Sequence, residues 1–123
     1  FLLGGANRMG CEATIAAWET GCTWMDELVQ KLDTRRMHLK SRLIAEIPEA
    51  KMFLPNSTFL AWIDLSELNP GKEPAKWLRD KTGIACGNGP DFGSGGENHI
   101  RLTFGTSINL LDEMIGRIVK ALN

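Results

Sequence analysis

A stripe of apolar residues between positions 24 and 47 constrains the fold more than any other feature of the sequence. The stripe recurs at four- or seven-residue steps until Pro48, and this spacing predicts an amphipathic helix. Its members are Leu28, Leu32, Leu39, Leu43 and Ile47. A helix from 24 to 47 is roughly 36 Å long, which is more than a chain of 123 residues needs to cover one sheet. We therefore expect part of it to brace another domain.

Three further helices are predicted. Residues 10–20 are rich in helix formers, and Gly21 follows as a left-handed stop. Proline at the first position favours a helix over residues 74–81. Near the end of the chain, Thr106 or Ser107 can cap a final amphipathic helix. The apolar stripe of that helix consists of Ile108, Leu111, Ile115, Ile118 and Leu122.

Strand signals lie between these helices. Residues 58–65 are aromatic and branched on both faces, which predicts a central strand. Residues 84–86 predict a short second strand. Residues 99–104 alternate, so that Arg101 and Thr103 lie on the face opposite the apolar side chains. The order of elements predicts an α/β domain of α+β-like, two-layer type: a small three- to four-stranded sheet with helices on one face, preceded by a long helix.

A glycine-rich segment separates the last two predicted strands. Residues 87–96 contain five glycines and are predicted to form a flexible loop. Phe92 stands where a dinucleotide fingerprint needs its third glycine, and it also breaks the glycine pattern of a nucleophile elbow around Ser94. The segment is longer than a hairpin requires, which suggests a functional role.

Composition and charge exclude several classes of partner. The net charge is -1 and the pI is about 6.1, so the chain lacks the basic surface that nucleic acid or an anionic membrane requires. No apolar run approaches the roughly 18 to 20 residues of a membrane span. The first residues, Phe1-Leu2-Leu3-Gly4-Gly5, resemble neither a signal peptide nor a natural start. We expect a piece of a longer protein.

Cysteine and histidine usage gives two more expectations. Cys11, Cys22 and Cys86 form an odd set without C-x-x-C spacing, which favours a reducing, cytoplasmic location. His38 and His99 have no ligand spacing, so no metal site is expected. His38 is instead expected to be a packing or surface residue of the long helix.

Arg101 is the most informative polar residue. Arginine is mostly exposed in proteins, and a solvated side chain is the simplest interpretation. However, the adjacent strand directs Leu60 and Trp62 toward the same face, which another domain could cover. A guanidinium there could grip a carboxylate through two parallel hydrogen bonds. The expected ligand is therefore a small anionic molecule.

The chain resembles the C-terminal small domain of the pyridoxal-phosphate-dependent class I/II aminotransferases, in particular the cystathionine β-lyase or carbon-sulfur lyase branch. Residues 12–28, 55–64 and 91–104 carry the resemblance. It implies a fold type I small domain in which Arg101 binds the α-carboxylate of an amino-acid substrate. It also implies that the loop containing Phe92 and Gly93 lies at the mouth of the active site.

The resemblance also implies what lies elsewhere. None of the seven lysines has a serine three residues before it, so the Schiff-base lysine and the groups that bind pyridoxal phosphate are expected in a large domain upstream. The resemblance divides the chain into a linking segment with a short helix, residues 1–22, and the small domain, residues 23–123. The parent is expected to be a homodimeric enzyme, an aminotransferase or a carbon-sulfur β-lyase. This chain alone is expected to bind no cofactor and to be inactive.

Two other interpretations remain open. The order of elements also occurs in non-catalytic regulatory modules that bind amino acids. A pure interaction domain would use the apolar surface around Trp62 to contact another protein.

Overall fold

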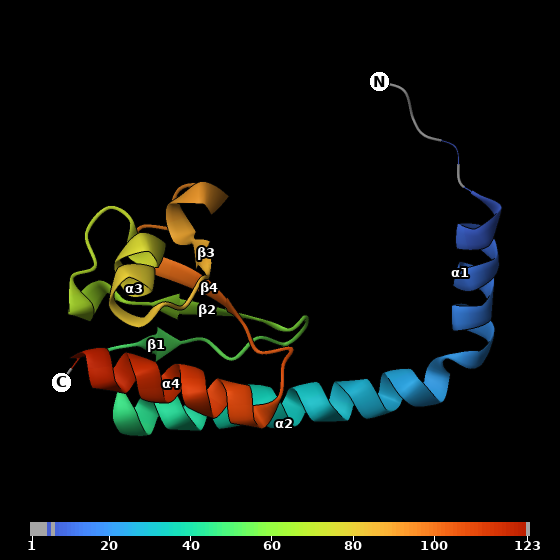
Figure 1. The fold of residues 1–123 in the computed structure, drawn as a ribbon, viewed down its shortest axis with the longest axis horizontal. Helices are drawn as coiled ribbons and strands as arrows, with labels where there is room; N and C mark the ends of the chain where they lie inside the picture. Colours follow the sequence, from blue (N-terminus) through green and yellow to red (C-terminus); the bar gives the residue numbers. More distant parts are fainter. Residues whose placement is uncertain (1–4, 6, 123) are drawn as a thin grey trace. The chain divides into compact units, whose positions relative to one another are not determined.

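The computed structural model describes residue 5 and residues 7–122 (Figure 1). The chain divides into two compact units, residues 1–31 and residues 32–123. The run Phe1–Gly4, which contributed to the expectation of a longer parent, lies outside the described residues. The predicted division at residues 22 and 23 stays a prediction.

The first unit contains α1 (Arg8–Thr20) and the beginning of α2 (Cys22–Glu46). Both predicted helices are confirmed, with ends shifted by one or two residues. Gly21 does not adopt the predicted left-handed conformation, because its φ is -86°. Its amide donates to the carbonyl of Ala17, and the amide of Met25 donates to the carbonyl of Gly21. Helical hydrogen bonding therefore continues past Gly21, and no left-handed cap is needed.

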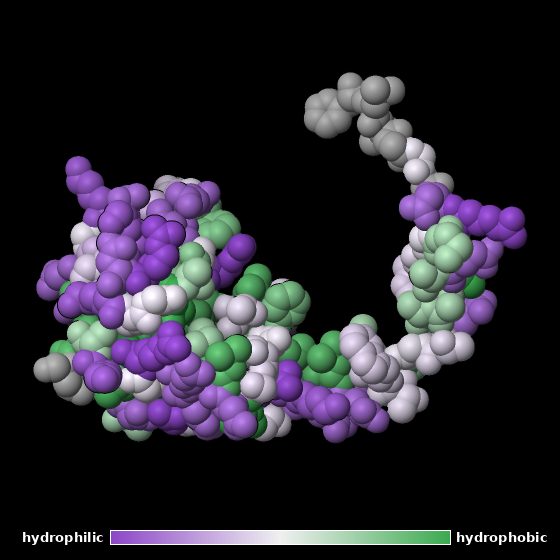
Figure 2. Space-filling model, in the orientation of Figure 1, coloured by the Kyte–Doolittle hydropathy of each residue, from purple (hydrophilic) through white to green (hydrophobic). Residues whose placement is uncertain are grey.

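Helix α1 exposes large apolar side chains. None of its residues is buried, and Met9 and Trp18 are 80% and 81% exposed. Figure 2 shows green, apolar surface beside purple, hydrophilic surface on the visible side of this helix. An amphipathic helix normally buries its apolar side chains against a partner. Within the described residues of the first unit, α1 buries none of these side chains.

The second unit is built on a four-stranded antiparallel sheet with the order β1-β2-β4-β3. The strands are β1 (Lys51–Met52), β2 (Leu60–Asp64), β3 (Gly87–Asn88) and β4 (His99–Thr103). The prediction of a central strand within residues 58–65 is confirmed, because β2 lies between β1 and β4. The alternation predicted for residues 99–104 is also confirmed, since Ile100 and Leu102 are buried while Arg101 and Thr103 are exposed.

The prediction of a strand at residues 84–86 is wrong. Ile84 is buried in the core, and pairing with β4 begins only at Gly87, opposite Arg101. The glycine-rich segment is therefore not entirely loop. It begins with β3 and continues as η2 (Gly89–Phe92), a short 3-10 helix. Composition alone did not indicate that two residues of this segment extend the sheet.

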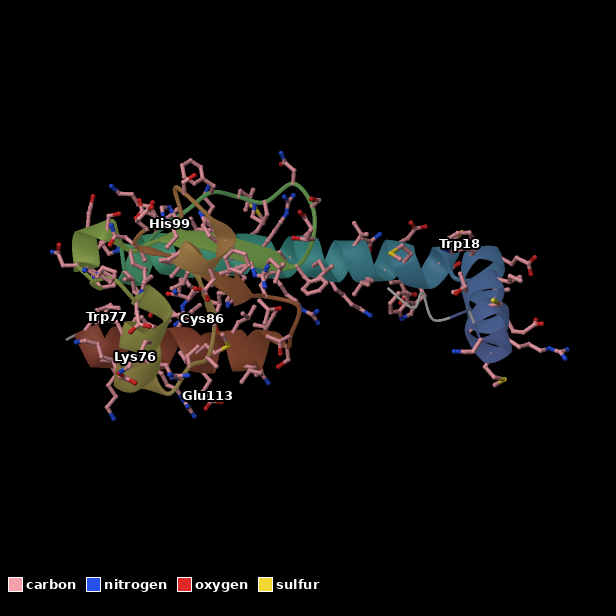
Figure 3. The ribbon with its side chains drawn as sticks, turned by 90° about the horizontal axis from the view of Figure 1, so that it is seen from above. Trp18, Lys76, Trp77, Cys86, His99 and Glu113 are labelled. Carbon is pink, nitrogen blue, oxygen red and sulfur yellow. The ribbon has the colours of Figure 1, made fainter. Side chains whose placement is uncertain are left out.

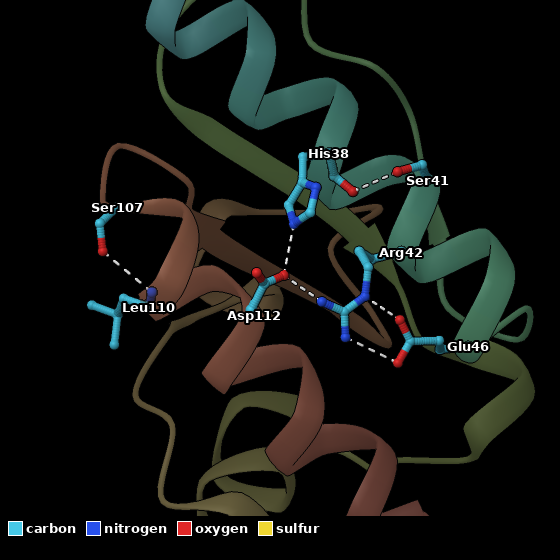
Figure 4. Close-up of polar contacts among 7 residues, drawn as sticks. All are labelled: His38, Ser41, Arg42, Glu46, Ser107, Leu110 and Asp112. Carbon is cyan, nitrogen blue, oxygen red and sulfur yellow. Dashed lines mark hydrogen bonds and ion pairs between the residues drawn. The ribbon is translucent and has the colours of Figure 1, made fainter.

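Helices cover one face of the sheet, as predicted. The buried face contributes Ala61, Ile63, Ile100 and Leu102 to a single hydrophobic core. The C-terminal part of α2, α3 (Pro74–Thr82) and α4 (Ile108–Leu122) supply the other side; a 3-10 helix, η1 (Ser66–Leu68), follows β2. Helix α4 begins at the predicted cap, since the amide of Leu110 donates to Oγ of Ser107 at 3.2 Å (Figure 4). The predicted two-layer architecture is confirmed.

A polar network joins α2 to α4 (Figure 4). Nε2 of His38 lies 2.7 Å from Oδ1 of Asp112, and Arg42 contacts the same carboxylate oxygen. Arg42 also pairs with Glu46, with Nη2 3.0 Å from Oε2. The hydrogen bond from His38 is the main cause that lowers the pKa of Asp112, and Arg42 adds to it. His38 is thus a partner in an interhelical contact.

We expect Asp112→Asn to lower the melting temperature near neutral pH. A carboxyl whose pKa is depressed on folding stabilises the fold above its ordinary pKa, here 3.8, and that contribution is lost as the pH falls through the folded-state pKa. The gap in melting temperature between wild type and variant should therefore close progressively below pH 3.8. Glu113→Gln is the control, because Glu113 pairs with Arg117 of its own helix. A gap that stays constant with pH would contradict this role of Asp112.

Candidate functional site

The open face of the sheet, opposite the core, gathers polar and aromatic side chains from β2 and β4. Trp62 and Arg101 are directly opposed in the register, and Asp64 is opposed to His99. Trp62 and His99 are half-buried, whereas Arg101 is exposed. Figure 3 shows His99 on the side away from the labelled α3 residues Lys76 and Trp77. The predicted meeting of Arg101 and Trp62 on one face is confirmed.

Three rings on this face form what we call the aromatic cluster: Trp62, Phe92 and His99. The rings of Trp62 and Phe92 meet edge to face, with centroids 5.8 Å apart and an interplanar angle of 76°. The rings of Trp62 and His99 are stacked at 5.3 Å and 19°. Cζ of Arg101 lies 4.2 Å from the centroid of Phe92. The guanidinium therefore stands against an aromatic wall, a typical cation-π arrangement.

Arg101 has its hydrogen-bonding groups available. In the described part of the chain, which is residue 5 and residues 7–122, Arg101 forms no ion pair with a carboxylate. Cζ of Arg101 lies over the Phe92 ring, and the N–H donors lie in the plane of the guanidinium. Arg101 is thus suited to bind a planar anion through parallel hydrogen bonds.

The segment that carries Phe92 is a series of hydrogen-bonded turns. Gly93 follows η2 with φ 108°, in the left-handed region, and its amide donates to the carbonyl of Pro90 at 3.2 Å. The amide of Gly95 donates to Oε2 of Glu97 at 2.9 Å. These bonds place Phe92 over the open face, and Gly93 lies at the exposed turn beside it.

His99 is a site residue that sequence reasoning considered only as a metal ligand. Its Nδ1 donates to the carbonyl of Glu97 at 2.7 Å, which fixes the ring against Trp62. The signal was present in the sequence, since residues 99, 101 and 103 share one face of β4. Over the described range there is no group of three or more metal-binding side chains.

Cys86 lies near the sheet edge but is not a nucleophile at neutral pH. Burial raises the pKa of its thiol to about 11. The reactive form of cysteine is the thiolate, so Cys86 stays protonated and acts as a partly buried packing residue.

Lys51, a lysine on the open face of the sheet, is not suited to anchor pyridoxal phosphate. Lys51 lies opposite Asp64 in the register and so belongs to the open face. It pairs with Glu67, and this hydrogen bond raises the pKa of Lys51. A Schiff base requires a neutral amine, so Lys51 is unsuited to bind an aldehyde covalently. The Arg101 guanidinium on the same face is instead suited to bind a carboxylate.

Comparisons with known proteins agree on one family. Residues 6–118 match the family model described as aminotransferase class I and II. Cystathionine beta-lyase PatB of Bacillus subtilis is 32% identical over 98% of this chain and 32% of its own length.

Solved structures give the same result. The pyridoxal-phosphate-bound C-S lyase of Staphylococcus hominis superposes with a TM-score of 0.89 at 29% identity, over 98% of this chain and 33% of that one. Cystalysin of Treponema denticola, which contains pyridoxal 5'-phosphate, gives 0.87 at 25% identity over 94% and 30%. The chain thus spans about a third of the length of the curated relatives it matches. Over the residues described, none of the helices has the length and apolar character needed to cross a membrane.

Proposed function

Because the chain belongs to the class I and II aminotransferase family, we propose that it is the C-terminal small domain of a pyridoxal-phosphate-dependent enzyme that acts on amino acids. The observation that carries the proposal is Arg101, a guanidinium with available donors on the open face of the sheet. Its role is to bind the α-carboxylate of the substrate. A hydrogen bond to a charged group contributes roughly 1.5 to 3 kcal/mol.

The carboxylate contact determines how the substrate is oriented. Pyridoxal phosphate, when bound, supplies an electron sink for the carbanion at Cα. Arg101 fixes the carboxylate, which sets the angle of the Cα bonds. Phe92 of the aromatic cluster lies against the guanidinium, in a contact of cation-π type. We place the cofactor anchor in the part of the parent outside this chain, and we propose that the chain alone is inactive.

Helix α1 and the first turns of α2 are proposed to pack against the missing large domain. Exposed apolar side chains occur on both helices: Met9, Ile15, Trp18, Trp24, Met25 and Val29. Exposed apolar surface of this kind is typical of an interface. The family relation further suggests a homodimer, and the three free cysteines are compatible with a cytoplasmic protein.

The relatives favour a carbon-sulfur lyase over an aminotransferase, since those described above are named cystathionine beta-lyase and C-S lyase. The test is to incubate the full-length enzyme with cystathionine and to measure its products. A lyase releases a thiol, pyruvate and ammonia from the substrate. Formation of the 2-oxo acid of the intact substrate, dependent on an amino-group acceptor, would indicate an aminotransferase instead.

A regulatory module that binds amino acids is the alternative. We expect calorimetry to detect no binding of cystathionine or other amino acids to the 123-residue chain, because one open face cannot enclose a small ligand as a pocket does. Binding of the same ligands by the full-length protein is the control. Saturable binding to the chain alone would favour the regulatory module.

A further inference from the structure

We propose that Phe92 is a positioning residue that holds the Arg101 guanidinium ready for the substrate, and that Gly87 leaves room for its ring. This inference rests on the proposed role of Arg101. It gives the glycine-rich segment a function, which is to hold the Phe92 ring against the guanidinium of Arg101.

The first observation is the cation-π contact. Cζ of Arg101 is 4.2 Å from the centroid of Phe92, well inside the roughly 6 Å range of such contacts. The cation-π contact involves Cζ, whereas a carboxylate binds through the N–H donors, so the proposal places both contacts on one guanidinium. Phe92 is 49% exposed, so a substitution at this position leaves the hydrophobic core unchanged.

The second observation is that Phe92 is itself held in place. Its ring meets Trp62 edge to face, and Trp62 is stacked on His99. The aromatic cluster thus connects Phe92 to both central strands of the sheet. Phe92 lies outside the strands, but side chains of β2 and β4 hold its ring in place.

The third observation concerns Gly87, which is opposite Arg101 in the register. A Cβ atom at this position would lie 3.3 Å from Cβ of Arg101 and 3.3 Å from both Cε2 and Cζ of Phe92. Contacts this short force a neighbour to move. Gly87 therefore provides the space in which the Phe92 ring reaches Arg101.

The physical benefit is entropic. A free arginine side chain populates many rotamers, and part of that freedom is lost when a substrate fixes it. If Phe92 orders the guanidinium beforehand, substrate binding no longer bears that cost. Loss of Phe92 should weaken substrate binding and leave the chemical step largely intact.

The test is steady-state kinetics of the full-length holoenzyme. We expect Phe92→Leu to raise KM for the amino acid about three- to ten-fold, with kcat within about two-fold. Phe92→Tyr, which keeps the ring, should restore KM. Gly87→Ala should raise KM in the same way, while Gly116→Ala on α4, where an added Cβ meets nothing within 4 Å, should not. Adding Phe92→Leu to Arg101→Ala should cause no further rise, because the two residues act through one contact.

A second readout is independent of activity. In the ¹⁵N-arginine-labelled chain, NMR measures rotation about the Nε–Cζ bond of Arg101, which we expect to become faster in Phe92→Leu. If Arg101→Ala raises KM but Phe92→Leu changes neither KM nor this rotation, the role of Phe92 is wrong and the proposed function stands. If Arg101→Ala leaves KM unchanged, the proposed function fails, and the inference fails with it.

Discussion

Arg101→Ala raises KM for the amino-acid substrate about ten-fold to a hundred-fold in the full-length enzyme. The expected size follows from the roughly 1.5 to 3 kcal/mol that a hydrogen bond to a charged group contributes. Arg101→Lys should also be impaired, because an ammonium group cannot supply the planar pair of donors. Steady-state kinetics of the three proteins measures the effect.

Arg117→Ala is the matched control. Arg117 is an exposed arginine of α4 that pairs with Glu113 of its own helix. Because α4 packs on the core side of the sheet, this substitution changes the charge by the same amount and leaves the open face unaltered. Its KM should stay near the wild-type value. Equal KM values for Arg101→Ala and wild type, in a variant that still folds, would contradict the assignment.

The largest expected effect on stability comes from Phe104→Ala. Phe104 is completely buried and directly follows β4, with its amide donating to the carbonyl of Phe59 at 2.9 Å. Removing a buried phenylalanine ring leaves a cavity and typically costs about 3 to 5 kcal/mol of the free energy of unfolding. Urea unfolding of the chain measures this loss.

The same substitution at Phe53 distinguishes the effect of burial on stability from the effect of losing a phenylalanine ring. Phe53 is 77% exposed, so Phe53→Ala should change the free energy of unfolding by no more than about 0.5 kcal/mol. Equal losses at the two positions would show that Phe104 is not part of the cooperative core.

The elements that the sequence predicted well are those with a periodic apolar face. The stripes of α2 and α4 repeat because each helix packs one side on the core, and β4 alternates because one face is buried and the other is open. Shorter elements were missed or misplaced. β1 has only two residues, too few for any period, and β3 contains a glycine whose pairing depends on its neighbour strand rather than on its own preference.

The candidate site was predictable only in part. Arg101 and Trp62 were placed on one face because strand alternation is local information. The contact between Arg101 and Phe92 could not be predicted, because it depends on how η2 turns back over the sheet. The stacking of His99 on Trp62 depends likewise on the register between β2 and β4, which a single sequence does not specify. The space at Gly87 depends both on the turn of η2 and on the register of the strands.

The most direct test of the central claim compares an amino-acid substrate with its methyl ester, which lacks the carboxylate charge. The kcat/KM ratio of acid to ester should be high for the wild-type enzyme and should fall about ten-fold to a hundred-fold in Arg101→Ala, mainly through loss of activity toward the acid. If Arg101→Ala discriminates between acid and ester as strongly as the wild type does, another group binds the carboxylate and the account is wrong.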